Sequence, residues 1–572
     1  MASTGSADTD EDGTEVGVEE GHPLDQIQTL NERDARDQYA LEAVDCGQGI
    51  LSGILRSRTR SHTDHMVIGW EVDDPGNPHN WSTSRKTFVV LICVMLVLNS
   101  TMSSALPSMA IPYITAEYGI SETTENVLPI SVFLIGYIFG PLIWGPLTEH
   151  YGRRNLSVVT FVVFILFTMA CALAPSWASF LFFRMVCGAC AGAPIAIVAG
   201  ILADVFGDHR TRGRAYAVFM VATVWGPLFS PIISGYTSIT IGWRWAFWIG
   251  LMYAGFTLLV VAWLPETFGP ILLERRARKM RGQDPTLRVV APRELEETSL
   301  GQLLTVVITR PIRMLASELI VTATCAYLAL VYAIFYMSFQ AFPIIFHDLY
   351  GLNPGETGLT YLLIGAGGMI SLPIFWYWDV ALVKAQVRGA PWSQREEFRR
   401  LPLACMGGPL FVVSLFWLGF SARTPIPFVV PMLAGIPFGM GYMLIFMALL
   451  NYLTDSYEVF AASANAAASC CRSILAVVLP LATTHMFREL GIAGACSLIG
   501  GLSAVMCVIP FLFIWKGPGI RARSKFCIAL REQKEETQRR ADAQRARLER
   551  MKEDKEKDNS KGVKEVSGTE EV

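Results

Sequence analysis

The chain has 572 residues, of which 52% are hydrophobic and 17% charged, and its formal net charge is −3. This small net charge gives no reason to expect nucleic acid as a partner, because nucleic-acid-binding proteins carry strongly basic surfaces. The charged residues gather at the two ends and in one central stretch. The rest of the chain is therefore more apolar than the average, as in a protein that spans a membrane.

Residues 1–86 are rich in acidic, Ser, Gly and Thr residues. Few aromatic residues occur there, so most of this region is predicted to be disordered. No basic segment followed by a short apolar core is present, so no secretory signal peptide is expected. The first apolar span would then act as the targeting signal.

Twelve apolar segments follow, each long enough to cross a bilayer as a helix. Six precede and six follow a charged stretch, which indicates an all-α membrane protein with two six-helix bundles. The bundles are expected at 87–265 and 317–515, separated by a central loop at 266–316 and followed by a charged tail at 516–572. The predicted spans are 87–109, 126–147, 156–175, 178–203, 214–237, 245–265, 317–345, 356–378, 403–421, 427–452, 459–486 and 493–515.

Lys and Arg occupy alternate connections between these spans. The connections at 112–126, 174–179 and 346–358 contain neither residue. Because cationic loops stay on the cytoplasmic side, both termini are predicted to be cytoplasmic.

The connection after the second span, residues 145–154, reads Gly-Pro-Leu-Thr-Glu-His-Tyr-Gly-Arg-Arg and resembles the loop signature of the major facilitator superfamily. Its two glycines would let helix ends approach closely, and Glu149 with Arg153 could form an ion pair that exists in one conformation and breaks in another. The alternative is a short loop that merely obeys the charge rule. The expected charge cluster at the cytoplasmic rim comprises Gly145, Glu149, Gly152, Arg153, Asp204 and Asp455.

Arg184 lies inside the fourth span, where an arginine is costly unless it faces a cavity or a partner. The resemblance to the superfamily implies that it takes part in proton coupling. The alternative is an arginine that extends to the outer interface.

The fifth span contains Gly226, Pro227, Pro231 and Gly235. This segment is similar to the signature of antiporters in the superfamily. The prolines would bend the helix, and the glycines would permit tight packing against a helix of the other bundle.

Further matches extend over most of the membrane region and are similar to fungal twelve-span drug:proton antiporters, including polyamine and multidrug exporters. They include residues 77–82 (Asn-Pro-His-Asn-Trp-Ser), 264–268 (Leu-Pro-Glu-Thr-Phe) and 451–457 (Asn-Tyr-Leu-Thr-Asp-Ser-Tyr). Two positions depart from that pattern. Glu149 stands where many members carry aspartate, and Gln340 stands where an acid is common, which disfavours a polyamine substrate.

Polar or aromatic residues within the spans are candidate substrate contacts, although each could instead hold helices together. Arg472 is the strongest candidate, because a buried cation beside two cysteines has few structural reasons to be there. It could attract an anionic or carboxylate-bearing substrate. The candidates are Asn99, Tyr332, Tyr336, Gln340, Asn465 and Arg472.

No nucleotide-binding or catalytic motif is found, so the chain is expected to be no enzyme and to use an ion gradient rather than a cofactor. The leading hypothesis is a monomeric antiporter of the fungal plasma membrane that exports small organic compounds in exchange for protons. An internal membrane such as the vacuolar one is the alternative location. Alternative functions are uptake on the same fold and a non-transporting receptor or scaffold.

Overall fold

The computed structural model describes residues 66–70, 73–121, 125–284, 289–295, 300–395, 397–457, 460–524 and 526–528, with four isolated positions beyond them. The chain divides into two compact units. Among the described residues, the small unit comprises 66–70 and 273–295, and the helical unit comprises the rest. The N-terminal residues predicted to be disordered and most of the charged tail lie outside the described residues.

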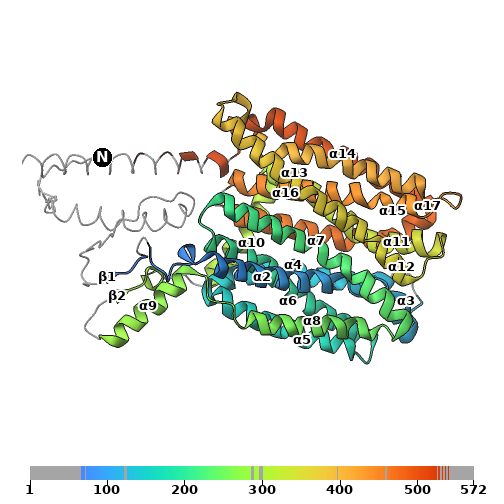
Figure 1. Cartoon of the computed structure of the whole chain (residues 1–572), viewed down its shortest axis with the longest axis horizontal. Helices are drawn as coiled ribbons and strands as arrows, with labels where there is room; N and C mark the ends of the chain where they lie inside the picture. The colour runs from blue at the N-terminus through green and yellow to red at the C-terminus, as the bar shows by residue number, and fades with distance from the viewer. Residues whose placement is uncertain are drawn as a thin grey trace, which may run out of the picture. The chain divides into compact units, whose positions relative to one another are not determined.

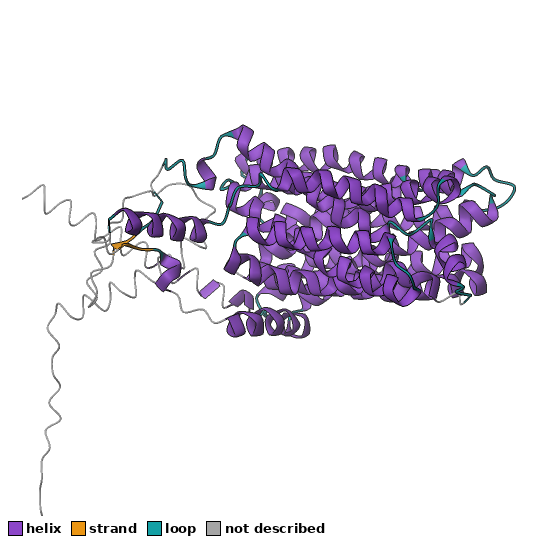
Figure 2. Ribbon diagram, turned by 90° about the horizontal axis from the view of Figure 1, so that it is seen from below, coloured by secondary structure: helices purple, strands orange, loops and turns teal. Residues whose placement is uncertain are grey.

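Helices build the larger unit (Figures 1 and 2). Six long ones precede the central segment: α2 (Thr83–Ala105), α4 (Leu128–Tyr151), α5 (Arg153–Ala172), α6 (Trp177–Val205), α7 (His209–Thr240) and α8 (Arg244–Val261), with the short α3 (Ile111–Tyr118) after α2. The second half contains α10 (Leu300–Ser317), α11 (Leu319–Phe342), α12 (Pro354–Thr360), α13 (Leu362–Val387), α14 (Glu397–Ser421), α15 (Val429–Leu433), α16 (Gly435–Tyr457) and α17 (Ala461–Arg521). Within the described part of the chain, eleven helical stretches are long and apolar enough to cross a membrane.

The last of these stretches, α17, makes two passes. Its 61 residues would measure roughly 90 Å as one straight helix, about three times the apolar thickness of a bilayer. Gly491 breaks it with φ 68° and ψ 173°, a conformation that glycine adopts without steric cost. Phe460 before α17 and Phe526 after it have ring centroids 5.2 Å apart, so the chain reverses at Gly491. The predicted twelve membrane passes are therefore confirmed.

The passes form two bundles (Figure 1). In the first, α4 packs on α6, α2 on α7, and α5 on α6 and α8. In the second, α11 and α14 pack on α17, and α16 packs on α13 and α14. Contacts of α7 with α12 and of α4 with α17 join the two bundles. We call the end of the helical unit where α5, α7, α11, α14 and α17 begin the basic end.

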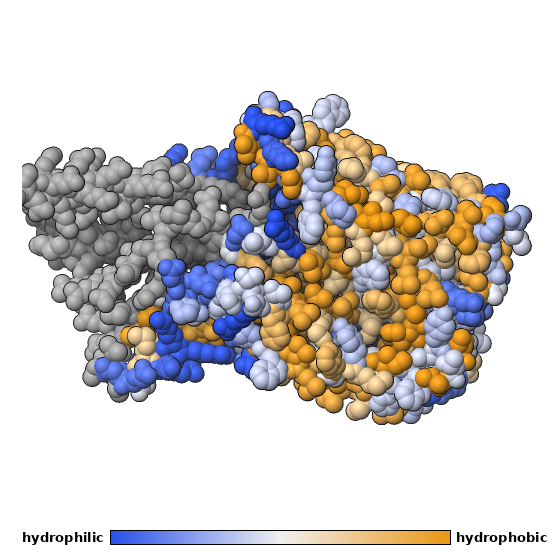
Figure 3. Space-filling model, in the orientation of Figure 1, coloured by the Kyte–Doolittle hydropathy of each residue, from blue (hydrophilic) through white to orange (hydrophobic). Residues whose placement is uncertain are grey.

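Apolar side chains cover the flanks of the helical unit (Figure 3). Leu259 is 69% exposed and Val505 67% exposed. Trp263 and Trp515, at the basic ends of two passes, are 78% and 75% exposed, as expected of tryptophans at a membrane–water interface. A surface this apolar is suited to lipid rather than water.

The small unit contains the two short strands of the described chain, β1 (Met66–Val67) and β2 (Val289–Val290), drawn in orange in Figure 2. The strands pair in parallel, with Met66 opposite Val289. Part of α9 (Gly269–Gln283) covers them, and an apolar cluster fills the space between. The buried members of this cluster are Leu273, Ala277, Val289 and Ala291. The segment predicted as the central loop thus holds α9, β2 and α10.

Candidate functional site: the bundle interface and the basic end

Arg153 is the centre of a charge cluster at the basic end. Its Nε donates to Asp204 Oδ2 at 3.2 Å, and its side chain also donates to the Thr148 hydroxyl. The Thr267 hydroxyl donates to the same Asp204 oxygen at 3.2 Å. The Arg153 and Asp204 side chains are 9% and 17% exposed, so little water screens the pair.

Glu266, which the sequence analysis did not single out, completes this cluster. It is 5% exposed, and its Oε1 accepts hydrogen bonds from the backbone N–H of Arg153 at 2.9 Å and from those of Thr267 and Phe268 at 3.1 Å. Arg153 begins α5, so Glu266 satisfies free N–H groups at that helix start. Gly152 has φ 92°, and a Cβ there would lie 2.4 Å from Glu266 Oε2. The positive φ favours glycine at this position, and a Cβ would also displace the Glu266 carboxylate.

Two features predicted for this loop are absent from the observed conformation, although the Glu149–Arg153 pair was predicted for only one of two conformations. Glu149 is exposed, and Arg153 pairs with Asp204 instead of with it. Gly145 has open space where a Cβ would be, so no close helix approach depends on it. The exposed glutamate loses nothing by staying in water, whereas the buried arginine needs an acceptor.

The second bundle carries a similar cluster, and Asp455 belongs to it rather than to the Arg153 cluster. Arg400 Nε lies 3.1 Å from Asp455 Oδ2, with side chains 17% and 35% exposed. Beside it, Arg521 Nη2 lies 3.1 Å from Glu397 Oε1. The sequence analysis placed Asp455 correctly at a pass end but in the wrong cluster, because helix packing decides which rim residues meet.

Arg184 is fully buried and does not extend to the outer interface. It donates to the carbonyl oxygens of Ser103 at 2.8 Å, Ser104 at 3.0 Å and Pro129 at 2.9 Å. Pro107 has no N–H to offer Ser103 O four residues earlier, and the Ser108 N–H bonds to Ala105 O instead of Ser104 O. Arg184 therefore caps carbonyls that the end of α2 leaves free.

The antiporter-like segment of α7 touches both bundles. A Cβ on Gly226 would overlap Thr101 of α2, and one on Gly235 would lie 2.4 Å from Pro354 O of α12. Only Gly235 therefore makes the predicted close approach to the other bundle. The helix continues through Pro227 and Pro231 from His209 to Thr240.

A chain of hydroxyl groups crosses the interface between the bundles. Tyr332 donates to the Tyr336 hydroxyl at 3.5 Å, and the Tyr336 and Ser104 hydroxyls lie 2.8 Å apart. Since Ser104 donates its own proton to Thr101 O, Tyr336 is the donor in that contact. Two predicted substrate contacts of α11 thus reach α2 of the first bundle.

Arg472 lies beside this chain. Its Cζ is 5.4 Å from the centroid of the Tyr332 ring and 5.2 Å from that of Phe446. Its Nε is buried and has no hydrogen-bond partner among the described residues.

The other predicted contacts are more scattered. Asn99 donates to Thr257 Oγ1 at 2.7 Å and so joins α2 to α8 within one bundle. Asn465 lies in the first turns of α17, at the basic end, where it donates to Thr454 Oγ1 at 3.0 Å. Gln340 has a buried Oε1 without a partner among the described residues.

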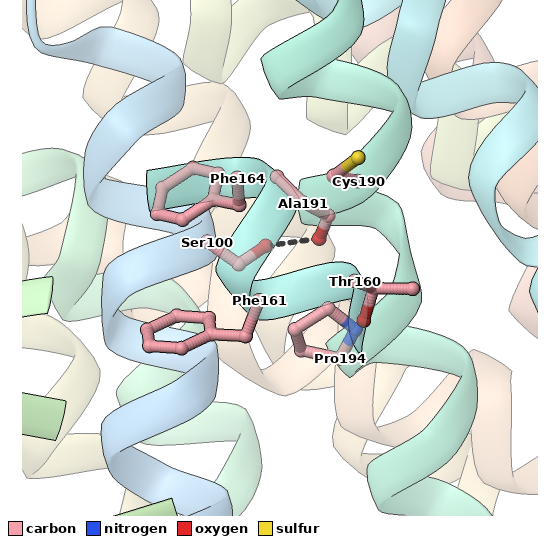
Figure 4. A pocket seen from close by; sticks show the side chains of 7 residues that line it. All are labelled: Ser100, Thr160, Phe161, Phe164, Cys190, Ala191 and Pro194. Atoms are coloured by element: carbon pink, nitrogen blue, oxygen red, sulfur yellow. Dashed lines mark hydrogen bonds between the residues drawn. The ribbon is translucent and has the colours of Figure 1, made fainter. Parts of the chain in front are cut away.

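Side chains fill the space around these residues. Figure 4 shows a hollow within the first bundle, between α2, α5 and α6, where the Ser100 hydroxyl donates to Ala191 O. A second hollow, lined by Asn99, Thr168 and Gly250 among others, has a volume of about 10 Å³. That volume is about enough for one water molecule. Both hollows lie within the first bundle.

Comparison with known proteins accounts for this arrangement. Residues 92–480, more than half of the chain, match the model of the Major Facilitator Superfamily. The chain is 34% identical to the MFS transporter prlG of Fungal sp. (strain NRRL 50135), covering 80% of this chain and 96% of that protein. It is 35% identical to the efflux pump FUB11 of Gibberella moniliformis, covering 80% and 77%, and 32% identical to polyamine transporter 3 of Saccharomyces cerevisiae, covering 78% and 71%.

The fold also matches solved structures. The xylose transporter XylE of E. coli, in a partially occluded inward-open conformation, gives a TM-score of 0.55 at 16% identity, covering 76% of this chain and 98% of that one. The family match, the twelve passes and the two bundles agree. The chain therefore belongs to the Major Facilitator Superfamily and is a multi-pass membrane transporter, not an enzyme.

Proposed function

We propose that this transporter exports small organic compounds in exchange for protons. The observation that carries the proposal is the position of α7: its antiporter-like segment packs on α2 through Gly226 and on α12 of the other bundle through Gly235. Relatives named efflux pumps, at 34–35% identity, support the direction of transport.

The exchange would proceed by alternating access. The bundles meet at Ser104 of α2, Tyr336 of α11 and the part of α17 that holds Arg472, so rocking one bundle against the other would open this region first to one side and then to the other. Gly235 lets the backbones of α7 and α12 touch, and this contact is suited to a pivot. The cytoplasmic location of both termini and of the basic end is part of this proposal.

Asp204 is the best-placed acid to carry the proton. It shares Arg153 with Glu266, whose Oε1 already accepts three backbone N–H groups. The Asp204 carboxylate accepts hydrogen bonds only from Arg153 and the Thr267 hydroxyl among the described residues. Protonation of Asp204 would release Arg153 and loosen the link between α5 and α6.

Accumulation of fluorescent compounds in transporter-deficient fungal cells tests the proposal. Cells that express the chain should accumulate less of at least one compound, and a protonophore should remove the difference. Asp204→Asn should also remove it, whereas Glu489→Gln, an exposed acid near the reversal in α17, should not. Surface labelling controls for expression.

The alternatives predict other results. Higher accumulation in expressing cells would indicate uptake, and an unchanged level over a broad panel would favour a receptor or scaffold. Export that persists with a protonophore would refute proton coupling. Fluorescence microscopy of the tagged chain tests the proposed plasma-membrane location against the vacuolar membrane, and sizing in detergent tests the proposed monomer.

A further inference from the structure

Arg472 has a positive charge that its surroundings do not neutralise. No ion pair or hydrogen bond of its guanidinium is found among the described residues, and its Nε is buried. The rings of Tyr332 and Phe446 attract the charge. They offer no oxygen to its N–H groups, and a buried donor without an acceptor is unfavourable.

The sequence around Arg472 offers no acid to compensate it. Most acidic residues of the described passes occur close to helix ends, as Asp204, Glu397 and Asp455 do, and Asp379 lies eight residues before the end of α13. None of these four carboxylates pairs with Arg472 within the described residues. Carbonyl oxygens accept hydrogen bonds from the guanidinium of Arg184. The guanidinium of Arg472 has no such acceptor among the described residues.

Arg472 also lies where a substrate of this fold would bind. Its neighbour Cys470 places Sγ 4.0 Å from Ile138 O of α4, so this part of α17 adjoins the first bundle. On its other side, Tyr332 and Tyr336 lead to Ser104 of α2. The cation is thus next to groups that separation of the bundles would expose.

We propose that Arg472 binds the anionic group of a planar aromatic organic acid. A guanidinium can donate two parallel hydrogen bonds to one carboxylate. The rings of Tyr332 and Phe446, whose centroids are 5.9 Å apart, would then contact the aromatic body of the same molecule. This inference rests on the proposed export function and names its substrate class.

The proposal also states which compounds are excluded. A cationic amine would meet the charge of Arg472 with no acid to offset it. Polyamines are therefore poor substrates of this chain, although one relative is named polyamine transporter 3.

Equilibrium binding to the purified full-length protein in detergent tests the proposal. The probe is tritiated 2-naphthoate, and the competitors are unlabelled 2-naphthoate, its methyl ester and N-methylquinolinium, which share one planar shape and differ in charge. We expect the acid to compete about tenfold or more better than the ester, because only the acid forms charge-assisted hydrogen bonds, and the quinolinium to compete least.

Arg472→Gln should abolish the preference for acid over ester, and Arg472→Lys should keep part of it. Arg488→Gln, which removes an exposed arginine of the same helix, should leave the preference unchanged. Equal competition by acid and ester in the wild type, or a preference that survives Arg472→Gln, would overturn the proposal. A wild type that binds none of the three would also reject it, while dye export in the cellular assay would leave the proposed function standing.

Discussion

Arg184 in the first bundle is fully buried and Arg472 in the second is half-buried, and the two arginines meet opposite surroundings. Arg184 of α6 donates to three carbonyl oxygens. Arg472 of α17 lies against two aromatic rings and keeps a buried Nε unpaired within the described residues. An arginine within the passes can therefore serve the fold, by capping a broken helix end, or can be reserved for a ligand. Its hydrogen-bond acceptors distinguish the two roles.

The basic ends of the bundles show a related contrast. Arg153 with Asp204 joins the start of the third pass to the end of the fourth, and Arg400 with Asp455 does the same for the ninth and tenth. These matching positions agree with an internal repeat. Each cluster also has a third charged residue at the end of the last pass of its bundle, and these two residues have opposite charges. Glu266 follows the sixth pass, and Arg521 ends the twelfth.

Substitution of Arg184 and of Arg472 should give the largest difference. Arg184→Gln removes charge-assisted hydrogen bonds to three carbonyls, so we expect the free energy of unfolding to fall by about 3 kcal/mol or more. Arg472→Gln removes an unpaired cation and should change it by less than about 1 kcal/mol. Thermal unfolding of both purified variants measures the difference. Equal destabilisation would show that Arg472 is also a structural residue.

A methyl group at the contact between the bundles should have the next largest effect. In Gly235→Ala the new Cβ would meet Pro354 O at 2.4 Å, and backbone overlap of this kind is expected to cost about 1–3 kcal/mol. Because the strain lies between bundles, export should fall more than stability. Gly145→Ala, where a Cβ meets open space, is the matched control. Normal export by Gly235→Ala would contradict the proposal that the contact between α7 and α12 is a pivot.

Double-mutant cycles compare the two rim pairs. The coupling between Arg153 and Asp204 should be about 1–3 kcal/mol, because both side chains are mostly buried. The coupling between Arg400 and Asp455, whose carboxylate is 35% exposed, should be below about 1 kcal/mol. Alanine at each position and at both, followed by chemical unfolding, gives the two values. A larger coupling energy for Arg400 with Asp455 would contradict the expectation that the Arg153–Asp204 pair is the stronger of the two.

The fold was largely predictable from the sequence because apolar runs and their polar connections report membrane passes directly. The reversal at Gly491 falls between the predicted spans 459–486 and 493–515. The partners of the rim residues were less predictable. Glu266 lies 113 residues from Arg153 in the sequence and bonds to its backbone N–H. A bond to a backbone N–H requires no particular side chain at the partner position, so the sequence gives no sign of it.

Arg184 and Arg472 show the same limit. Sequence reasoning identified both as costly, but their surroundings depend on contacts between distant helices. The role of Arg184 follows from carbonyls that Pro107 and the end of α2 leave free. That of Arg472 follows from where Tyr332 and Phe446 place their rings.

The smallest expected effect lies in the small unit, where an ion pair is exposed to water. Arg281 donates to Glu294 through two N–H groups, at 2.6 and 2.9 Å, and these bonds hold the pKa of Glu294 below its ordinary value of 4.5. Because folding lowers this pKa, the pair stabilises the unit above pH 4.5, and the contribution is lost as the pH falls toward the lowered value.

Hydrogen exchange at the Ile68 amide, which donates to Val290 O at 3.1 Å, reports on that unit. Glu294→Gln should speed exchange about twofold at neutral pH, since an exposed pair contributes little. The wild type and the variant should converge in acid, because protonated glutamate and glutamine are both neutral. A difference that persists in acid would mean that the side-chain shape of Glu294, and not its charge, holds β1 against β2. An effect as large as that at the Arg153 cluster would contradict the rule that burial sets the strength of these pairs.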